Sequence, residues 1–225
     1  MPTSHSAVDL GADPFDTPLD ATLATLTPVD DRLTVAVDVL EVEARKRALR
    51  RGIRARRRER DEPTAAAVDA DLARVLIGCP LLAGARRVAC YSSLPGEPGT
   101  RTLLAELRRH DVEVLLPVRL PDDDLDWTAR PGRPDTPGTL GVQAVSSVDL
   151  VVVPALAVDT AGRRLGQGGG SYDRALRRVP SRVPVLAVVH DDELHDAAVS
   201  PLPTLPHDRL VQAVVTPSRW LWLAA

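Results

Sequence analysis

Aromatic residues, lysine and cysteine are all scarce in this chain of 225 residues. Phe, Trp and Tyr together make up 3% of it, so the hydrophobic core must be built from Ala, Val and Leu. Lys46 is the one lysine, and every other residue of the basic set is arginine. The two cysteines, Cys79 and Cys90, have no CxxC spacing. We interpret them as ordinary buried thiols in a reducing cytosol.

Long apolar runs and a strong net charge are also absent. No run approaches the roughly 18 apolar residues that a membrane-spanning helix needs. The first residues lack the basic-then-apolar pattern of a secretory signal. The formal net charge of -3 provides no overall attraction to nucleic acid or to a membrane surface. We therefore expect a cytoplasmic monomer with no nucleic-acid or membrane partner.

The distribution of charge divides the chain near residue 40. Residues 1–40 contain seven Asp, one Arg and scattered prolines, which predicts an acidic, weakly ordered extension. Residues 41–225 are predicted to form a single domain. They begin with a basic helix, because ten of the sixteen residues in 45–60 are Arg or Lys, and Val42, Leu49 and Ile53 follow a helical spacing. A second helix is predicted over 64–77, with Pro63 and Thr64 as start signals.

Short apolar segments then alternate with helical ones. Strands are predicted over 86–91, 112–117, 148–156, 183–190 and 209–216, the last of which we expect to close the sheet. Helices are predicted over 100–110, 171–179 and 191–199. The segment VDLVVVPAL is apolar at consecutive positions, which is typical of a strand that is covered on both faces. The predicted fold class is therefore α/β: a three-layer, Rossmann-like arrangement of a mostly parallel sheet with helices on both faces.

A glycine-rich loop lies between the 148–156 strand and the 171–179 helix. Its glycines fall within five residues: Gly166, Gly168, Gly169 and Gly170. Loops that follow parallel strands are where such sheets bind ligands, and N–H groups beside a helix start favour phosphate. Ser171 is a suitable N-cap, and Asp173 in the first turn is placed to hold a divalent metal. The loop is neither a Walker A motif nor a dinucleotide fingerprint, which would need glycine at position 171.

The segment PALAVDTAGRRLGQGGGSYDRAL resembles, without a gap, the signature of the 5-formyltetrahydrofolate cyclo-ligase family. RKRALR is similar to that family's K-x-x-x-R element, and YSSLPGEPGT resembles its loop with a substrate-binding Glu. LLPV and LDWTARPG resemble its central segment, and PHDRLVQAVVTP resembles its C-terminal His-Asp and strand. The resemblance extends over about residues 41–217.

The resemblance implies an enzyme that uses ATP and Mg²⁺ to convert 5-formyltetrahydrofolate to 5,10-methenyltetrahydrofolate, ADP and phosphate. It assigns ATP binding to Lys46, Arg47, Arg50, Arg164, Gly166, Gln167, Gly168, Gly169, Gly170 and Tyr172. It assigns the folate to Glu97, Gln167 and Ser171, and Mg²⁺ to Asp173. Tyr172 and Trp127 are candidate apolar walls.

Several positions depart from the family pattern. Ser171 stands where the family has the first Tyr after the glycines, and Gln167 occupies a position that is often basic or Tyr. Val158 replaces a Phe, and Ala144 replaces a Glu. The phosphate and metal features remain, whereas the folate features are thinned. A diverged ATP-binding enzyme acting on another small acid or amide therefore stays open. Nucleic-acid binding through 45–60 is disfavoured, because that run has no interleaved aromatic residues.

Each candidate also has a simpler interpretation. Asp173 would complement the helix dipole, and Glu97 would be a solvated loop residue. Lys46 and Arg50 would belong to a solvated helical face. We interpret His207 and Asp208 as a cap and turn before the last strand, and Trp127 as a core or rim residue.

Overall fold

The structure is a computed structural model that describes residues 31–129 and 138–223. Side chains are described from residue 38 onward within those ranges, except at 62–65. The chain divides into two units, Met1–Asp38 and Val39–Ala225, and the interactions considered below lie within the second. Residues 1–30 of the predicted weakly ordered extension lie outside the described residues, whereas its last part, residues 31–40, belongs to the helix Asp31–Arg58. In the described part, no helix is both long and apolar enough to cross a membrane.

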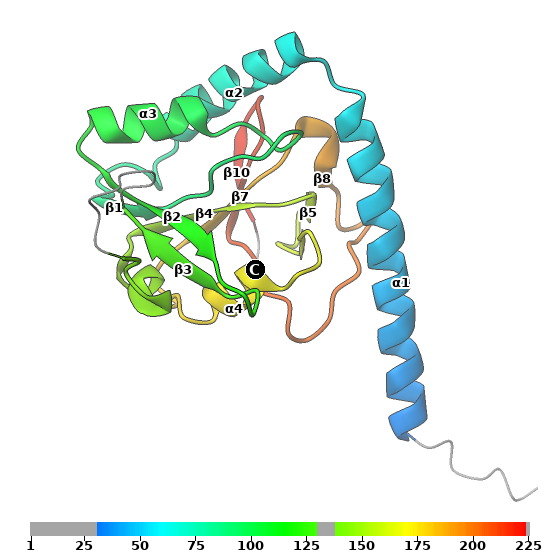
Figure 1. Cartoon of the computed structure of the whole chain (residues 1–225). Coiled ribbons are helices and arrows are strands. Elements are labelled where there is room, and N and C mark those ends of the chain that lie inside the picture. Colours follow the sequence, from blue (N-terminus) through cyan, green and yellow to red (C-terminus); the bar gives the residue numbers. More distant parts are fainter. Residues whose placement is uncertain (1–30, 130–137, 224–225) are drawn as a thin grey trace, which may run out of the picture. The chain divides into compact units, whose positions relative to one another are not determined.

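The sheet has a parallel centre and an antiparallel strand at each edge (Figure 1). Its order is β10 (Trp220–Trp222), β9 (Ala213–Val215), β7 (Val185–Val188), β4 (Leu150–Pro154), β1 (Arg87–Ala89), β2 (Glu113–Arg119) and β3 (Leu125–Thr128). Neighbouring strands from β9 to β2 pair in parallel, whereas β10 and β3 run antiparallel to their neighbours. The prediction of a mostly parallel sheet is confirmed. The strand near 209–216 does not close the sheet, because β10 pairs outside it.

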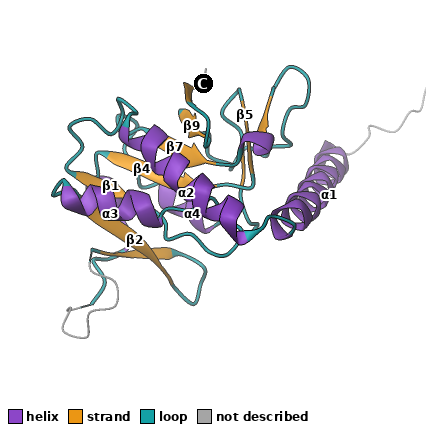
Figure 2. Ribbon diagram, turned by 90° about the horizontal axis from the view of Figure 1, so that it is seen from above, coloured by secondary structure: helices purple, strands orange, loops and turns teal. Residues whose placement is uncertain are grey.

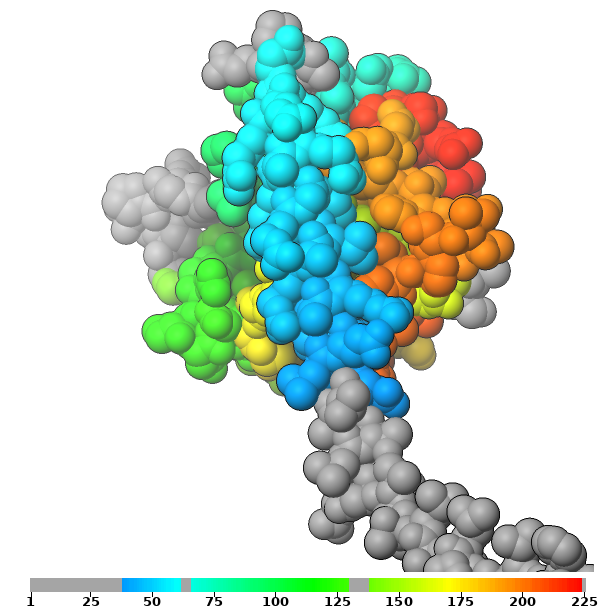
Figure 3. Space-filling view, turned by 90° about the vertical axis from the view of Figure 1, so that its right-hand side faces the viewer, coloured from blue at the N-terminus to red at the C-terminus, as the bar shows by residue number. Residues whose placement is uncertain are grey.

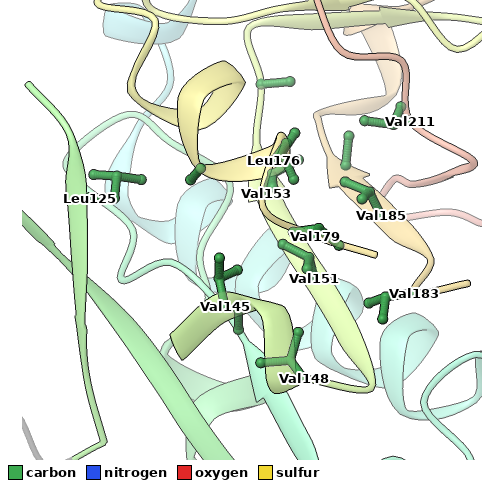
Figure 4. Packing of buried hydrophobic residues seen from close by; sticks show 14 of the residues in the cluster. Leu125, Val145, Val148, Val151, Val153, Leu176, Val179, Val183, Val185 and Val211 are labelled. Atoms are coloured by element: carbon green, nitrogen blue, oxygen red, sulfur yellow. The ribbon is translucent and has the colours of Figure 1, made fainter. Parts of the chain in front are cut away.

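Helices cover both faces of this sheet (Figure 2). On one face, α2 (Glu62–Ile77) and α3 (Arg101–Arg109) pack against Leu150 and Val152 of β4. On the other, α4 (Ser171–Leu176) and the 3₁₀ helix η1 (Val142–Ser147) pack against Val151 and Val153 (Figure 4). Successive side chains of a strand point to opposite faces, so a continuous apolar run supplies both cores. The predicted three-layer α/β architecture is confirmed.

A small second sheet and α1 (Asp31–Arg58) complete the unit that contains the site. The order of the small sheet is β6 (Arg164–Leu165), β5 (Ala157–Asp159) and β8 (Leu194–His195). Ile53 of α1, which is 1% exposed, packs with Leu156 and Leu165. The helix predicted over 191–199 was wrong beyond its first turn. Only the 3₁₀ turn η2 (Asp191–Glu193) forms there, because the next residues pair with β5 as β8.

The chain reverses its direction of travel across the sheet between β1 and β4. From β1 it proceeds outward to β2, whereas from β4 it proceeds the opposite way, through β7 to β9. The loops that leave the carboxyl ends of β1 and β4 therefore diverge and leave a crevice between them. This crevice brings the 91–100 loop and the glycine-rich loop together.

Candidate functional site

A cavity of about 660 Å³ occupies the crevice. Residues of α1, the loop after β1, the β2–β3 hairpin, the glycine-rich loop, α4 and the 207–208 turn line it. The predicted site residues among them are Lys46, Arg50, Glu97, Arg164, Gly166, Gln167, Gly168, Gly169, Gly170, Ser171, Tyr172 and Asp173. Arg47 is exposed on α1 and does not line the cavity, so the structure separates it from the other predicted residues.

The glycine-rich loop has a backbone that only glycine adopts readily at two positions. The φ angles of Gly168 and Gly170 are +110° and +68°, in a region that strains residues with a side chain. Gly170 is the N-cap of α4, and Ser171 is the first residue of the helix. Our prediction that Ser171 caps the helix was wrong: the left-handed glycine turns the chain, and no side chain caps α4.

Arginines surround this loop and bind its carbonyl groups. Arg50 Nε donates to Gly166 O at 3.0 Å, and Arg54 Nη2 donates to Gln167 O at 2.7 Å. Arg54 Nη2 also donates to Gln167 Oε1 at 2.8 Å, while Arg174 Nη2 donates to Gly169 O at 3.1 Å. The loop therefore lies in a positive environment that suits a phosphate chain.

Arg54 is not among the predicted site residues, although its spacing contains a signal. Lys46, Arg50 and Arg54 recur every fourth residue, so a helix places them on one face. In the basic run, other spacings fit nearly as well. Only the packing of Ile53 against Leu156 and Leu165 determines which side of α1 faces the loop. Figure 3 shows α1 beside the yellow segment that contains the glycines and the green segment around the β2–β3 turn.

Lys46 and Asp208 form an ion pair at the edge of the cavity. Lys46 is 3% exposed, and its Nζ lies 2.5 Å from Asp208 Oδ2. The same carboxylate oxygen accepts the Leu205 N–H at 2.6 Å. Burial disfavours the charged form of Asp208, but the hydrogen bonds from Lys46 and Leu205 outweigh it and lower the pKa. Asp208 thus has the turn-forming contact that we predicted and, in addition, neutralises a cation in the cavity.

Asp173 is bound by groups from two other segments. Arg164 Nη2 donates to Asp173 Oδ1 at 2.8 Å, and the Arg209 N–H donates to the same oxygen at 3.3 Å. Asp208 precedes Arg209, so two carboxylates from distant parts of the sequence stand at one side of the cavity. Within the described residues, no three His, Cys, Asp or Glu side chains gather into a metal cage. Mg²⁺ commonly uses one or two carboxylates together with substrate phosphates, and this donor set fits that pattern.

Glu97 reaches the cavity from the loop after β1. Its Oε1 accepts from Gln167 Nε2 at 3.3 Å, and its Oε2 accepts the Leu94 N–H at 3.0 Å. Tyr91 supports the loop, because its buried hydroxyl donates to Pro98 O at 2.7 Å. Burial is the main cause of a raised pKa for Tyr91. Glu97 is therefore half-buried and held towards the glycine-rich loop. Its neighbour there is the side-chain amide of Gln167, which a ligand could displace.

The two candidate apolar walls differ in position. Tyr172 lines the cavity, and burial raises the pKa of its hydroxyl. Trp127 is 1% exposed and belongs to the core on the α4 face, as the simpler interpretation held. Ala144, one of the departures, also packs against that core and does not line the cavity.

A buried ion pair anchors the end of α1 that follows the site residues. Arg57 Nε and Nη2 donate to the two oxygens of Glu193 at 2.8 and 2.7 Å, and Arg57 Nη2 also donates to Ala155 O at 2.6 Å. Glu193 is fully buried. Sequence analysis missed this pair, because nothing local distinguishes Arg57 from the arginines around it.

The model of the 5-formyltetrahydrofolate cyclo-ligase family matches residues 42–217. A 5-formyltetrahydrofolate cyclo-ligase of Mycolicibacterium smegmatis is 39% identical over 149 residues, which cover 60% of this chain and 75% of that protein. One from Escherichia coli is 31% identical over 158 residues, covering 64% of this chain and 85% of that protein.

Two solved structures share the fold. A 5,10-methenyltetrahydrofolate synthetase from Aquifex aeolicus has a TM-score of 0.66 at 24% identity and covers 80% of this chain and 93% of that chain. The corresponding protein of Mycoplasma pneumoniae has a TM-score of 0.63 at 18% identity, over 75% of this chain and 96% of that chain. Because the family model spans most of the sequence, this chain is an enzyme that belongs to the 5-formyltetrahydrofolate cyclo-ligase family.

Proposed function

We propose that this enzyme uses ATP and Mg²⁺ to convert 5-formyltetrahydrofolate to 5,10-methenyltetrahydrofolate, with release of ADP and phosphate. The observation that supports the proposal most strongly is the single cavity shared by Glu97, the glycine-rich loop and the cations around it. The cavity lies where α/β sheets with this topology bind ligands.

The chemical difficulty is that the formyl oxygen is a poor leaving group. Transfer of the γ-phosphoryl group of ATP to that oxygen releases ADP and gives an imidate-like phosphate. N10 then attacks the formyl carbon, phosphate departs with the oxygen, and the proton on N10 is lost. Such a sequence requires mainly positioning and charge neutralisation from the protein.

The cations of the cavity are the groups that would neutralise the phosphates. Lys46 and Arg50 approach from α1, and Arg164 approaches from β6. The bound metal would offset charge on the β- and γ-phosphates, and Asp173, with Asp208 beside it, would hold it. Arg164 Nη2 donates to Asp173 Oδ1 at 2.8 Å, and this contact would loosen if a metal took the carboxylate.

Glu97 is proposed to accept hydrogen bonds from the amino and amide groups of the pterin. Its present partner, the side-chain amide of Gln167, presents a comparable donor at 3.3 Å. The pterin would displace this amide, while Arg54 retains Gln167 through the backbone carbonyl. Ser171 lines the same cavity and would lie beside the folate.

A direct assay tests the proposal. Purified protein is mixed with Mg-ATP and 5-formyltetrahydrofolate, and the near-ultraviolet absorbance of the methenyl product is followed. We expect product only when all three components are present, with ADP formed in equal amount. Release of ADP without methenyl product would refute the folate reaction, and so would the absence of any reaction.

The second candidate is an ATP-dependent enzyme of the same fold that acts on a different small acid or amide. Ser171 favours it, because serine stands in the cavity where the family has an aromatic ring. In the same assay such an enzyme would bind Mg-ATP and ignore reduced folates.

We also propose that the protein acts as a monomer in the cytoplasm, without a nucleic-acid or membrane partner. Size-exclusion chromatography at the protein concentration of the assay tests whether the protein is a monomer.

A further inference from the structure

The cavity is also lined by a second group of cations, to which the proposed reaction assigns no role. They are Arg119 at the end of β2, Arg174 of α4 and Arg177 directly after α4. Figure 1 shows the β2–β3 turn beside α4, on one side of the sheet, and the loop after β1 towards α2 and α3 on the other. Glu97 and these arginines line the same cavity and come from different segments of the chain.

The charges of this arginine group are only partly neutralised. Arg119 Nε donates to Asp123 Oδ1 at 2.8 Å. Arg174 binds two backbone carbonyls, Asp123 O at 2.7 Å and Gly169 O at 3.1 Å, and no carboxylate. In the part of the chain that the structure describes, the Arg177 guanidinium has neither an ion pair nor a hydrogen bond.

Among the described residues, no carboxylate forms an ion pair with Arg174 or Arg177. Asp124 is occupied by Arg178, whose Nη1 lies 2.9 Å from Asp124 Oδ1. That hydrogen bond is the main cause of the lowered pKa of Asp124. Arg174 belongs to α4, and Arg177, three residues later, is its C-cap with helical backbone angles, so the two share one face of the chain there. Two guanidinium groups that form no ion pair among the described residues thus line the cavity together.

Apolar groups line the cavity as well. Pro117 precedes Arg119 by two residues on β2, so both belong to the same face of the strand. Leu125 of the paired strand and Tyr172 of α4 line the same stretch. The cavity thus presents a carboxylate, several apolar groups and a pair of cations.

A reduced folate carries groups that are complementary to those lining the cavity. Its pterin presents hydrogen-bond donors, its benzoyl ring is apolar, and its glutamyl group carries two carboxylates. We propose that Arg174 and Arg177 bind the glutamyl carboxylates, with Arg119 alongside, and that they select pteroylglutamates over pterins that lack this group. This inference rests on the proposed function, and guanidinium groups are suited to carboxylates through paired N–H donors.

A substrate-truncation cycle tests the inference. kcat/KM is measured for 5-formyltetrahydrofolate and for 5-formyltetrahydropteroate, which lacks only the glutamyl group, with the unaltered enzyme and with Arg177→Gln. A lost charge-assisted hydrogen bond corresponds to a factor of about ten or more. We expect the substitution to lower kcat/KM about tenfold more for the glutamyl substrate than for the truncated one. Arg174→Gln is expected to show the same selectivity.

Matched controls distinguish the possible results. Arg182→Gln removes an exposed arginine outside the cavity and is expected to match the unaltered enzyme with both substrates. An equal loss with both substrates, or a rise in the KM for ATP alone, would overturn the inference.

The inference can fail separately from the proposed reaction. If the enzyme turns over neither substrate, the reaction is refuted. Equilibrium binding of the two compounds in the absence of ATP then decides the inference. Tighter binding of the glutamyl compound that depends on Arg177 supports it, and equal binding overturns it.

Discussion

Replacing Arg57 with methionine tests whether one buried ion pair secures the helix that carries Lys46 and Arg50. Methionine retains much of the apolar stem and removes the guanidinium group. The change leaves Glu193, which is fully buried, without its two shortest hydrogen bonds, at 2.7 and 2.8 Å. Ala155 O loses its bond to the same group.

The structure sets the expected magnitude. Removing one partner of a buried ion pair costs about 3–5 kcal/mol, because the remaining charge is uncompensated. Glu193 would keep the Arg60 guanidinium at 3.3 Å and the His190 N–H at 2.9 Å, so we expect the lower end, about 3 kcal/mol. For a chain of this size, each kcal/mol lowers Tm by about 2–4 °C. The expected fall in Tm is therefore about 6–12 °C.

The same substitution should weaken ATP binding. Lys46 and Arg50 precede Arg57 on α1, and their place in the cavity depends on how this helix packs. Urea unfolding gives the free energy of unfolding, and titration with Mg-ATP gives the affinity. Both are expected to fall together in Arg57→Met.

Two further variants make the test decisive. Arg58→Met changes the exposed neighbour, and its free energy of unfolding is expected to stay within about 0.5 kcal/mol of the unaltered protein. The double variant Arg57→Met/Glu193→Met removes both charges and should be more stable than Arg57→Met alone. If Arg57→Met is as stable as Arg58→Met, the ion pair does not secure α1 and the reasoning is wrong.

Four other changes address the cavity itself. Asp173→Asn should reduce kcat strongly while Tm changes little, and normal turnover would leave Asp173 only the role of a partner for Arg164 and the helix dipole. Glu97→Gln should weaken folate binding about tenfold or more and leave ATP affinity unchanged; equal losses would indicate a folding defect. Ser171→Tyr should lower the folate KM severalfold, because it restores the aromatic ring that the family has at this position. The change should cost α4 little stability, since Ser171 makes no capping bond that it would break. Because the pKa of Asp208 is lowered by folding, its stabilising effect is complete above the unfolded pKa of about 3.9 and is lost as the pH falls through the folded pKa. The deficit of Asp208→Asn in urea unfolding should therefore be largest near neutral pH and shrink below about pH 4.

Much of the architecture could be predicted from local sequence. Strands such as VDLVVVPAL are apolar at consecutive positions because both faces are covered, and the structure confirms burial of the whole segment Leu150–Val153. The glycine-rich loop was recognisable because few backbones need four glycines between a strand and a helix. The ungapped signature around it identified the family, as the match over 42–217 shows.

The missed elements are those whose stability comes from distant partners. Residues 191–199 have helical composition, yet only the turn Asp191–Glu193 forms, because β8 pairs with β5. β10 is too short to be predicted from its own residues, and it forms through its pairing with β9. Pairing of this kind depends on side chains far away in the sequence, which local propensity does not contain.

The sequence by itself determined the fold class, the family and the position of the glycine-rich loop. These depend on periodicity and on a contiguous motif. Only the tertiary structure decided which arginines of a nearly uniform run serve the site. Arg50 and Arg54 bind the loop, Arg57 is buried with Glu193, and Arg47 is exposed to solvent. Identical side chains acquire different roles because the packing of Ile53 against the small sheet sets the rotation of α1 about its axis. That rotation determines which guanidinium groups are buried and which partners each of them can reach.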